Sequence, residues 1–269
     1  MTLPIQQHNQ RAASVWNAGG ADYDEISRHI ADSIEHCVLR LDPQPGERVL
    51  DVGTGTGWTA RRVARRGATV VGIDLGPDLI AAASVRARAE GLNIDYRVGD
   101  AENLPFGDGE FDAVISTFGV MFASRPQLAA TELARVCREG GRIALTTWLP
   151  DSNVAKIFAI MQRFMAPLPS TAPPSPFEWG RVDRIRELLG DVFDVKFESG
   201  VTFYRDRDGQ TAWNTFSSGF GPTKALVATI DKPRLAELAS DFIAFHEAFR
   251  SDLGINMPRE YWVTRGTRR

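Results

Sequence analysis

The sequence predicts an α/β fold in which helices cover both faces of a mostly parallel sheet. Between residues 49 and 148, short apolar runs alternate with stretches of helical spacing, and this order requires a parallel sheet with right-handed crossovers. The first apolar run, VLDVGTGTG, ends in Gly53, Gly55 and Gly57. Such a run is typical of a buried strand that leads through a tight turn into a helix and leaves its backbone open to close approach.

The predicted elements before residue 149 follow one another in a regular order. Residues 8–41 have helical spacing that is interrupted at Gly19-Gly20 and resumes in a helix over about 22–41. Glycines and prolines mark the ends of the later helices. We predict strands at about 49–52, 68–75, 95–98, 111–116 and 142–148, separated by helices at about 58–66, 77–91 and 124–140.

The pattern changes after residue 148. A proline-dense segment at 166–177 cannot continue a helix or a central strand, so we expect it to run extended over the surface as a lid. Further helices are expected near 153–165, at 181–189 and within 208–252, and further strands at 194–205 and 261–269. We therefore predict a single domain over 1–269, with a core at about 42–148, 181–205 and 258–269 and cap segments at about 1–41, 149–180 and 206–257.

The glycine spacing and two acids indicate the kind of ligand. A dinucleotide fingerprint needs a glycine where this chain has Trp58, and no GK[ST] sequence follows the loop, so NAD, FAD and a P-loop phosphate are disfavoured. The amide groups at the start of the next helix suit the carboxylate of an amino-acid-like ligand. Asp74 ends the second strand, where it can accept both hydroxyls of a ribose, and Asp100 ends the third strand, within reach of an adenine amino group.

Together these segments resemble the class I S-adenosylmethionine-dependent methyltransferases. The resemblance covers residues 45–148 and is strongest to the small-molecule group that includes the ubiquinone/menaquinone-biosynthesis C-methyltransferases. It implies a Rossmann-like sheet of seven strands with the last strand antiparallel. It also implies S-adenosylmethionine as cofactor and S-adenosylhomocysteine as product.

The resemblance also implies residues that bind the cofactor. Asp74 would bind the ribose, Leu75 would pack on the adenine, and Thr117 would flank the sulfonium. Asp100 and Ala101 would bind the adenine amino group and ring edge. The methionine end would be held by Asp51, Gly53, Thr54, Gly55 and Gly57, although Asp51 can also serve only to organise the loop.

The cap segments are expected to form the pocket for the methyl acceptor, because insertions at the functional edge of a common fold set its substrate preference. The candidate pocket residues are Trp16, Tyr23, Phe122, Trp148 and Phe177, with ordinary core packing as the alternative for each. If the acceptor needs a general base, the candidate titrating groups are Tyr23, His29 and His246. None of these three belongs to a recognisable catalytic pair.

Composition restricts the partners. The net charge of −3 offers no field for attracting nucleic acid, and no run is long and apolar enough for stable membrane insertion. The two cysteines and four histidines lack the spacing of metal ligands, so no metal is expected. We expect a cytoplasmic monomer or homodimer whose partner is a small-molecule methyl acceptor.

The predicted function is S-adenosylmethionine-dependent transfer of a methyl group to a carbon or oxygen of a small, fairly hydrophobic molecule by in-line displacement. The sequence STFGVMF follows the fourth strand where a [DN]PP[YFW] quartet would stand in the methyltransferases that modify amide or base nitrogen. The alternative is an S-adenosylmethionine-binding protein without methyl transfer, with a regulatory role or another chemistry.

Overall fold

The computed structural model describes residues 5–167 and 172–269, and it confirms the predicted α/β fold with a mostly parallel sheet. The central strands β3, β2, β1, β4 and β5 lie in this order and are parallel to their neighbours. The strands β8 and β6 continue the sheet in antiparallel pairing, as the resemblance implied. The strand bounds are Arg48–Val52 (β1), Thr69–Asp74 (β2), Asp95–Val98 (β3), Phe111–Thr117 (β4), Cys137–Trp148 (β5), Phe193–Asp206 (β6) and Gly254–Arg268 (β8).

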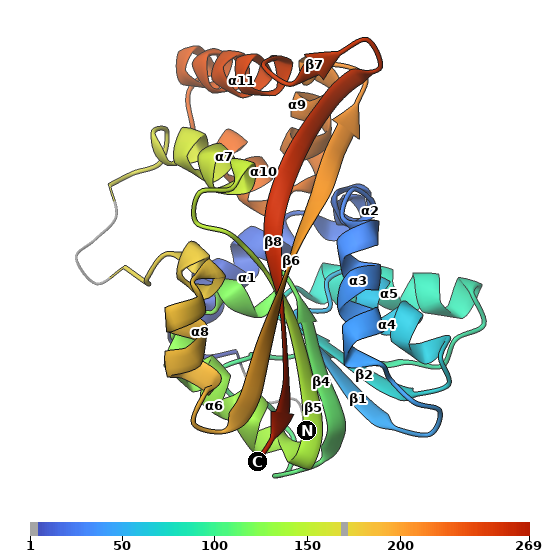
Figure 1. Cartoon of the computed structure of the whole chain (residues 1–269). Coiled ribbons are helices and arrows are strands. Elements are labelled where there is room, and N and C mark those ends of the chain that lie inside the picture. The colour runs from blue at the N-terminus through green and yellow to red at the C-terminus, as the bar shows by residue number, and fades with distance from the viewer. Residues whose placement is uncertain (1–4, 168–171) are drawn as a thin grey trace.

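Helices cover both faces of the sheet (Figure 1). The helices α3, α4 and α5 lie on one side of the central strands, and α6 and α8 lie on the other. Their bounds are Ala31–Leu41 (α3), Trp58–Ala64 (α4), Pro77–Ala89 (α5), Pro126–Val136 (α6) and Val182–Leu189 (α8). The large buried cluster around these elements contains apolar side chains of β1, β2, β4 and β5, which are buried because helices cover both sides of these strands.

A second buried cluster holds four helices beyond the sheet, which we call the cap helices. They are α7 (Asn153–Gln162), α9 (Gly209–Gly219), α10 (Gly221–Val227) and α11 (Lys232–Glu247). The long strands β6 and β8 extend past the rest of the sheet and carry the cap helices at their far end (Figure 1). Tyr204 and Met257 of these strands are buried among the cap helices, which ties the two parts of the molecule together.

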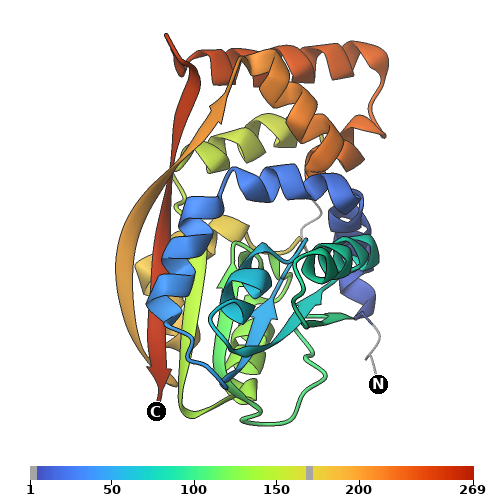
Figure 2. The ribbon, with the colours of Figure 1, turned by 90° about the vertical axis from the view of Figure 1, so that its right-hand side faces the viewer.

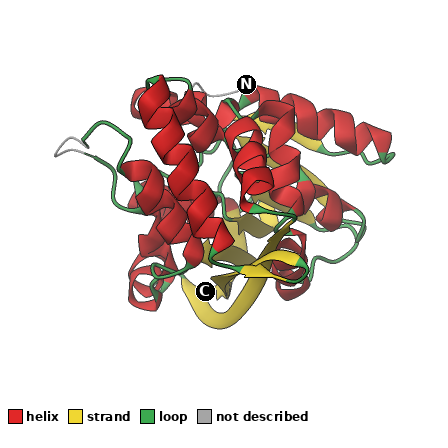
Figure 3. Ribbon diagram, turned by 90° about the horizontal axis from the view of Figure 1, so that it is seen from above, coloured by secondary structure: helices red, strands yellow, loops and turns green. Residues whose placement is uncertain are grey.

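The N-terminal elements lie between the cap helices and the carboxyl ends of the parallel strands (Figure 2). They are α1 (Gln10–Asn17) and α2 (Tyr23–Arg28), with single helical turns at Gln7–Asn9 and Gly20–Asp22. Seen from above, helices lie over much of the sheet (Figure 3). The space at the strand ends is therefore enclosed by segments that are far apart in the sequence.

Three sequence predictions about element bounds were wrong. The helix over 22–41 is two helices, because Ile30 leaves helical geometry with φ −121° and ψ 16°. The strand β5 begins at Cys137, before the glycine pair that we placed at a helix end, because Gly140 with φ 68° lies within an irregular start of this strand. The last strand begins at Gly254 and pairs with an additional short strand, β7 (Arg250–Ser251).

Part of the predicted lid lies outside the described residues, namely 168–171. The described end of that segment forms a helical turn at Pro176–Gly180. No helix in the described ranges is both long enough and apolar enough to cross a membrane.

Candidate functional site

The glycine loop after β1 folds back onto the end of β2. Gly53, Gly55 and Gly57 all have positive φ, at 69°, 54° and 81°. The amides of Gly53 and Thr54 both donate to the carbonyl of Ile73, at 2.8 and 3.0 Å, and the amide of Gly55 donates to Asp74 Oδ2 at 2.8 Å. These three loop amides are engaged within the protein, so donors for a ligand carboxylate have to come from other groups.

Asp51, at the end of β1, holds the glycine loop in place from inside the protein. Its side chain is fully buried, and its Oδ2 accepts a hydrogen bond from the Thr54 hydroxyl at 2.6 Å. Burial raises the pKa of Asp51 to about 7, because the surrounding protein disfavours the charged form. Gly57 directly precedes α4, and an added Cβ there would clash with Tyr96 Oη. Asp51 and Gly57 therefore support the shape of the loop, and neither borders the cavity that lies at the carboxyl ends of the strands.

Asp74 ends β2 and faces the cavity although protein surrounds it. Its Oδ2 accepts from the Gly55 amide at 2.8 Å, and its Oδ1 accepts from the Gly76 amide at 2.9 Å. Enclosure by the protein raises the pKa of this carboxyl, and backbone hydrogen bonds from Gly76, Gly55 and Leu75 oppose that shift. Because each carboxylate oxygen has two lone pairs, both oxygens keep capacity for a further donor such as a hydroxyl.

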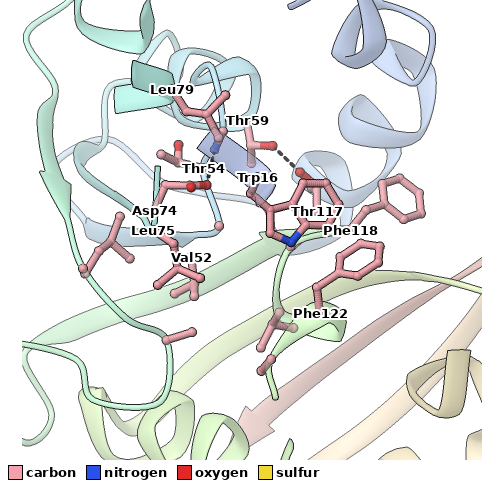
Figure 4. Close-up of a pocket in the computed structure, with 18 of the residues that line it drawn as sticks. Trp16, Val52, Thr54, Thr59, Asp74, Leu75, Leu79, Thr117, Phe118 and Phe122 are labelled. Atoms are coloured by element: carbon pink, nitrogen blue, oxygen red, sulfur yellow. Dashed lines mark hydrogen bonds between the residues drawn. The ribbon is translucent and has the colours of Figure 1, made fainter. Parts of the chain in front are cut away.

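A cavity of about 940 Å³, its open mouth included, lies at the carboxyl ends of the parallel strands (Figure 4). The ends of β1 to β4, the turn at Val120–Phe122 and the N-terminal segment contribute to its wall. The sequence-predicted cofactor residues that border it are Gly53, Thr54, Gly55, Asp74, Leu75, Asp100, Ala101 and Thr117.

Asp100 is held by the N-terminal segment. Its Oδ1 accepts from the Glu102 amide at 3.0 Å and from Asn9 Nδ2 at 3.1 Å. Its Oδ2 accepts from Asn9 Nδ2 at 2.9 Å and from the Gln6 amide at 3.2 Å. Sequence reasoning missed Asn9, because it belongs to no motif and reaches the strand ends only when the chain folds.

Aromatic side chains form one side of the cavity (Figure 4). The ring of Trp16 lies 4.6 Å from that of Phe122 and 6.2 Å from that of Tyr23, measured between centroids. Tyr23 lies against the glycine loop, since a Cβ on Gly55 would come within 3.4 Å of its ring. Three of the five predicted pocket residues therefore border the same space as the cofactor candidates.

Trp148 and Phe177 do not border this cavity. Trp148 stacks on Phe118 with 3.8 Å between ring centroids, and Phe118 is the ring that reaches the cavity. Phe177 packs against Phe158 at 5.4 Å. Phe118 has φ 56°, an unusual conformation for a bulky residue, which places it at the turn directly after β4. No sequence signal marked this conformation.

The end of β4 carries a hydroxyl pair. Thr117 Oγ1 and Thr59 Oγ1 lie 2.6 Å apart and share a hydrogen bond (Figure 4). Thr59 comes from α4, in the first turn after the glycine loop. Thr59 was not a sequence candidate, because it lies 58 positions from Thr117 and the two hydroxyls meet only in the folded chain.

The three candidate titrating groups lie in different places. Burial and the nearby Asp74 carboxylate both raise the pKa of Tyr23, so its phenol in the cavity stays protonated. His29 packs on Tyr204 with 4.5 Å between ring centroids, and burial lowers its pKa. His246 is fully buried against Phe242, and burial lowers its pKa to about 4. Neither histidine borders the cavity described above.

This chain is similar to known proteins in both sequence and fold. A family model described as a methyltransferase domain matches residues 50–145. An uncharacterized protein of Mycobacterium tuberculosis is 38% identical over 253 residues, which cover 89% of this chain and 89% of that protein. A demethylmenaquinone methyltransferase of Corynebacterium kroppenstedtii is 30% identical over 175 residues, which cover 62% of this chain and 73% of that protein. The YcgJ protein of Bacillus subtilis shares the fold, with a TM-score of 0.62 and 18% identity over 88% of this chain and 98% of that chain.

Proposed function

Because the chain belongs to the class I S-adenosylmethionine-dependent methyltransferases, we propose that it methylates a carbon or oxygen atom of a small, fairly hydrophobic molecule by in-line displacement. Its cofactor is S-adenosylmethionine, as the family resemblance predicted. When bound, this cofactor supplies a methyl group on a sulfonium, which is already a good electrophile. The observation that carries the proposal is a single cavity that polar cofactor candidates and aromatic side chains border together.

The residues at the strand ends fit the cofactor. Asp74 has lone pairs left for the two ribose hydroxyls, and Gly53 and Gly55 present no side chain that would keep a ligand from the backbone. Leu75 and Ala101 offer apolar surface for the adenine ring. Thr117, whose hydroxyl pairs with that of Thr59, would lie beside the sulfonium.

The aromatic side of the cavity would take the acceptor. Trp16, Phe118 and Phe122 would exclude water and hold an apolar molecule against the methyl group, which supplies the orientation that in-line displacement needs. The described residues that border the cavity include no lysine or arginine, so an anionic acceptor would lack an ionic partner there. The likeness to a demethylmenaquinone methyltransferase supports an apolar quinol or phenol as the first acceptor class to test.

Proton removal would not depend on the residues that sequence analysis singled out. Tyr23 holds its proton at neutral pH and can donate a hydrogen bond to an acceptor oxygen, but it cannot serve as the base. His29 and His246 lie away from the cavity. We therefore propose that the acceptor is acidic enough to react without a strong protein base, as an enol, a quinol or an acidic phenol is.

A labelled-methyl assay tests this function. Purified protein would be incubated with S-adenosylmethionine carrying a labelled methyl group and with matched quinols, phenols, carboxylates, amines and thiols. We expect label on a carbon or oxygen of the apolar acceptors and stoichiometric S-adenosylhomocysteine, with both reduced in Asp74→Ala when the cofactor is below saturation. Transfer confined to amines or thiols would contradict a carbon or oxygen acceptor, and transfer confined to carboxylates would contradict an apolar one. Cofactor binding without any turnover would favour the non-methylating alternative.

A further inference from the structure

A second cavity lies where α2, α4 and α5 meet, and its volume is about 650 Å³, open mouth included. The side chains that border it carry more positive than negative charge. The acids on its wall are Asp24 and Glu90, and the basic residues are Arg61, Arg62, Arg65 and Arg86. The bordering side chains that the structure describes therefore have an excess of two positive charges, although the whole chain has a net charge of −3.

Two carboxylates beside the cavity each pair with two arginines. The pairs are Arg62 and Arg66 with Glu35, at 3.2 and 2.9 Å, and Arg61 and Arg65 with Glu90, at 3.0 and 2.6 Å. If Arg62 and Arg65 were removed, each carboxylate would keep one arginine. Arg62 and Arg65 are thus the two positive charges that exceed what the neighbouring acids need.

Arg62 is held in position and keeps a free donor. Its guanidinium carbon lies 4.8 Å from the centroid of the Trp58 ring, its Nε donates to Glu35, and its Nη1 donates to the Trp58 carbonyl at 3.4 Å. Its Nη2 makes no hydrogen bond within the described ranges and is not enclosed by protein. Partial burial lowers the pKa of Arg62, and the charges of Arg65 and Arg61 lower it further, against the opposing effect of Glu35.

The acid on the opposite wall is already saturated with donors. Asp24 Oδ1 accepts from Trp58 Nε1 at 2.7 Å, from Thr56 Oγ1 at 3.0 Å and from Arg86 Nε at 2.9 Å. These donors reduce the repulsion that the Asp24 carboxylate would exert on an anion in the cavity. The positive charge of Arg62 and Arg65 therefore remains available to a ligand.

We propose that this second cavity binds a small molecule with two linked phosphate groups, through Arg62 and Arg65. A planar guanidinium matches phosphate oxygens in geometry, and two surplus cations suit two adjacent phosphates better than one. The Trp58 ring fixes the direction of Arg62, so little side-chain freedom is lost on binding. A free pyrophosphate and a diphosphate ester present the same group, and the site lies apart from the cavity at the strand ends, although Trp58 borders both.

Calorimetric titration at fixed ionic strength and without divalent cations tests the proposal. The probes are inorganic phosphate, pyrophosphate and isopentenyl diphosphate, and the last two distinguish the free ion from an ester. We expect pyrophosphate to bind at least about tenfold more tightly than phosphate. Arg62→Gln and Arg65→Gln should each weaken pyrophosphate binding by about tenfold. Arg88→Gln is a matched control that should change it by less than about twofold, because Arg88 is exposed on α5 and does not border the cavity.

A resonance of Trp58 locates the binding. Its indole N–H, assigned with Trp58→Phe, should shift in the wild type when pyrophosphate is added, because it donates to Asp24 on the cavity wall. An unshifted resonance, equal affinities for phosphate and pyrophosphate, or an equal loss in Arg88→Gln would reduce the effect to general surface attraction and overturn the proposal. Thermal unfolding of each variant controls for folding. None of these measurements depends on methyl transfer, so a failure here leaves the proposed function untouched.

Discussion

Replacement of Asp74 by alanine tests the ribose contact. The wild-type carboxylate faces the cavity and keeps lone pairs free beside its bonds from the Gly55 and Gly76 amides, at 2.8 and 2.9 Å. Each hydroxyl-to-carboxylate bond contributes roughly 1.5–3 kcal/mol before the cost of desolvating the carboxylate is subtracted. We expect a net loss of about 1–3 kcal/mol in cofactor binding, or about 5- to 150-fold in the dissociation constant.

The same substitution also affects folding, so the two effects have to be measured separately. Asp74→Ala leaves the Gly55 and Gly76 amides without their acceptor, which destabilises the loop, while removal of an enclosed charge partly offsets that loss. Calorimetry with S-adenosylhomocysteine gives the affinity, and urea unfolding without ligand gives the stability. Asp95→Ala is a matched control, because Asp95 lies at the opposite end of the neighbouring strand β3. An affinity in Asp74→Ala equal to that of this control would refute the ribose assignment.

Three further substitutions address the supporting structure. Because the pKa of Asp51 is raised to about 7, the folded state holds a proton that the unfolded state releases near pH 4, so this group's stabilising contribution falls as pH rises from about 4 to 7. Asp51→Asn keeps an acceptor for the Thr54 hydroxyl and should remove that fall in urea unfolding measured from pH 4 to 8. The pKa of His246 is lowered to about 4, so its contribution to folding stability is complete above pH 6.5 and is lost as pH falls toward 4. His246→Phe should therefore reduce the loss of stability in acid and leave cofactor affinity unchanged. Altered affinity would place the imidazole in the site. Gly57→Ala should lower the unfolding free energy by about 1–3 kcal/mol, because Gly57 has φ 81° and the new Cβ would clash with Tyr96 Oη. An unchanged unfolding free energy would show that the loop relaxes around the added Cβ.

The parts of the site that sequence reasoning placed correctly depend on local signals. The turn at Gly53 and Gly55 needs positive φ, Asp74 is the last residue of β2, and Asp100 lies two residues after the end of β3. Once the strands are known to be parallel, the carboxyl ends have to meet at one edge. The fold and these positions could therefore be predicted without long-range information.

The parts that were missed depend on packing between distant segments. Asn9 reaches Asp100 across 91 positions of the sequence, and Thr59 reaches Thr117 across 58. The aromatic candidates could not be sorted for the same reason, since Trp148 became the support behind Phe118 instead of a cavity residue. Composition marks such residues as buried but does not say which space they face.

The arrangement of helices in the cap could likewise be predicted only in part. Helical spacing in residues 208–252 anticipated helices, and three separate helices are found there, α9, α10 and α11. They pack against the extended ends of β6 and β8 in a second apolar cluster that also includes α7, a segment about 50 residues earlier in the chain. The predicted division into core and cap segments stays a prediction.

A crystal structure of the protein with S-adenosylhomocysteine tests the central claim most directly. We predict ligand density along the carboxyl ends of β1, β2 and β3, with the ribose hydroxyls on Asp74 and the adenine ring beside Leu75 and Ala101. Density for the ligand elsewhere, or a ribose that makes no contact with Asp74, would contradict the account.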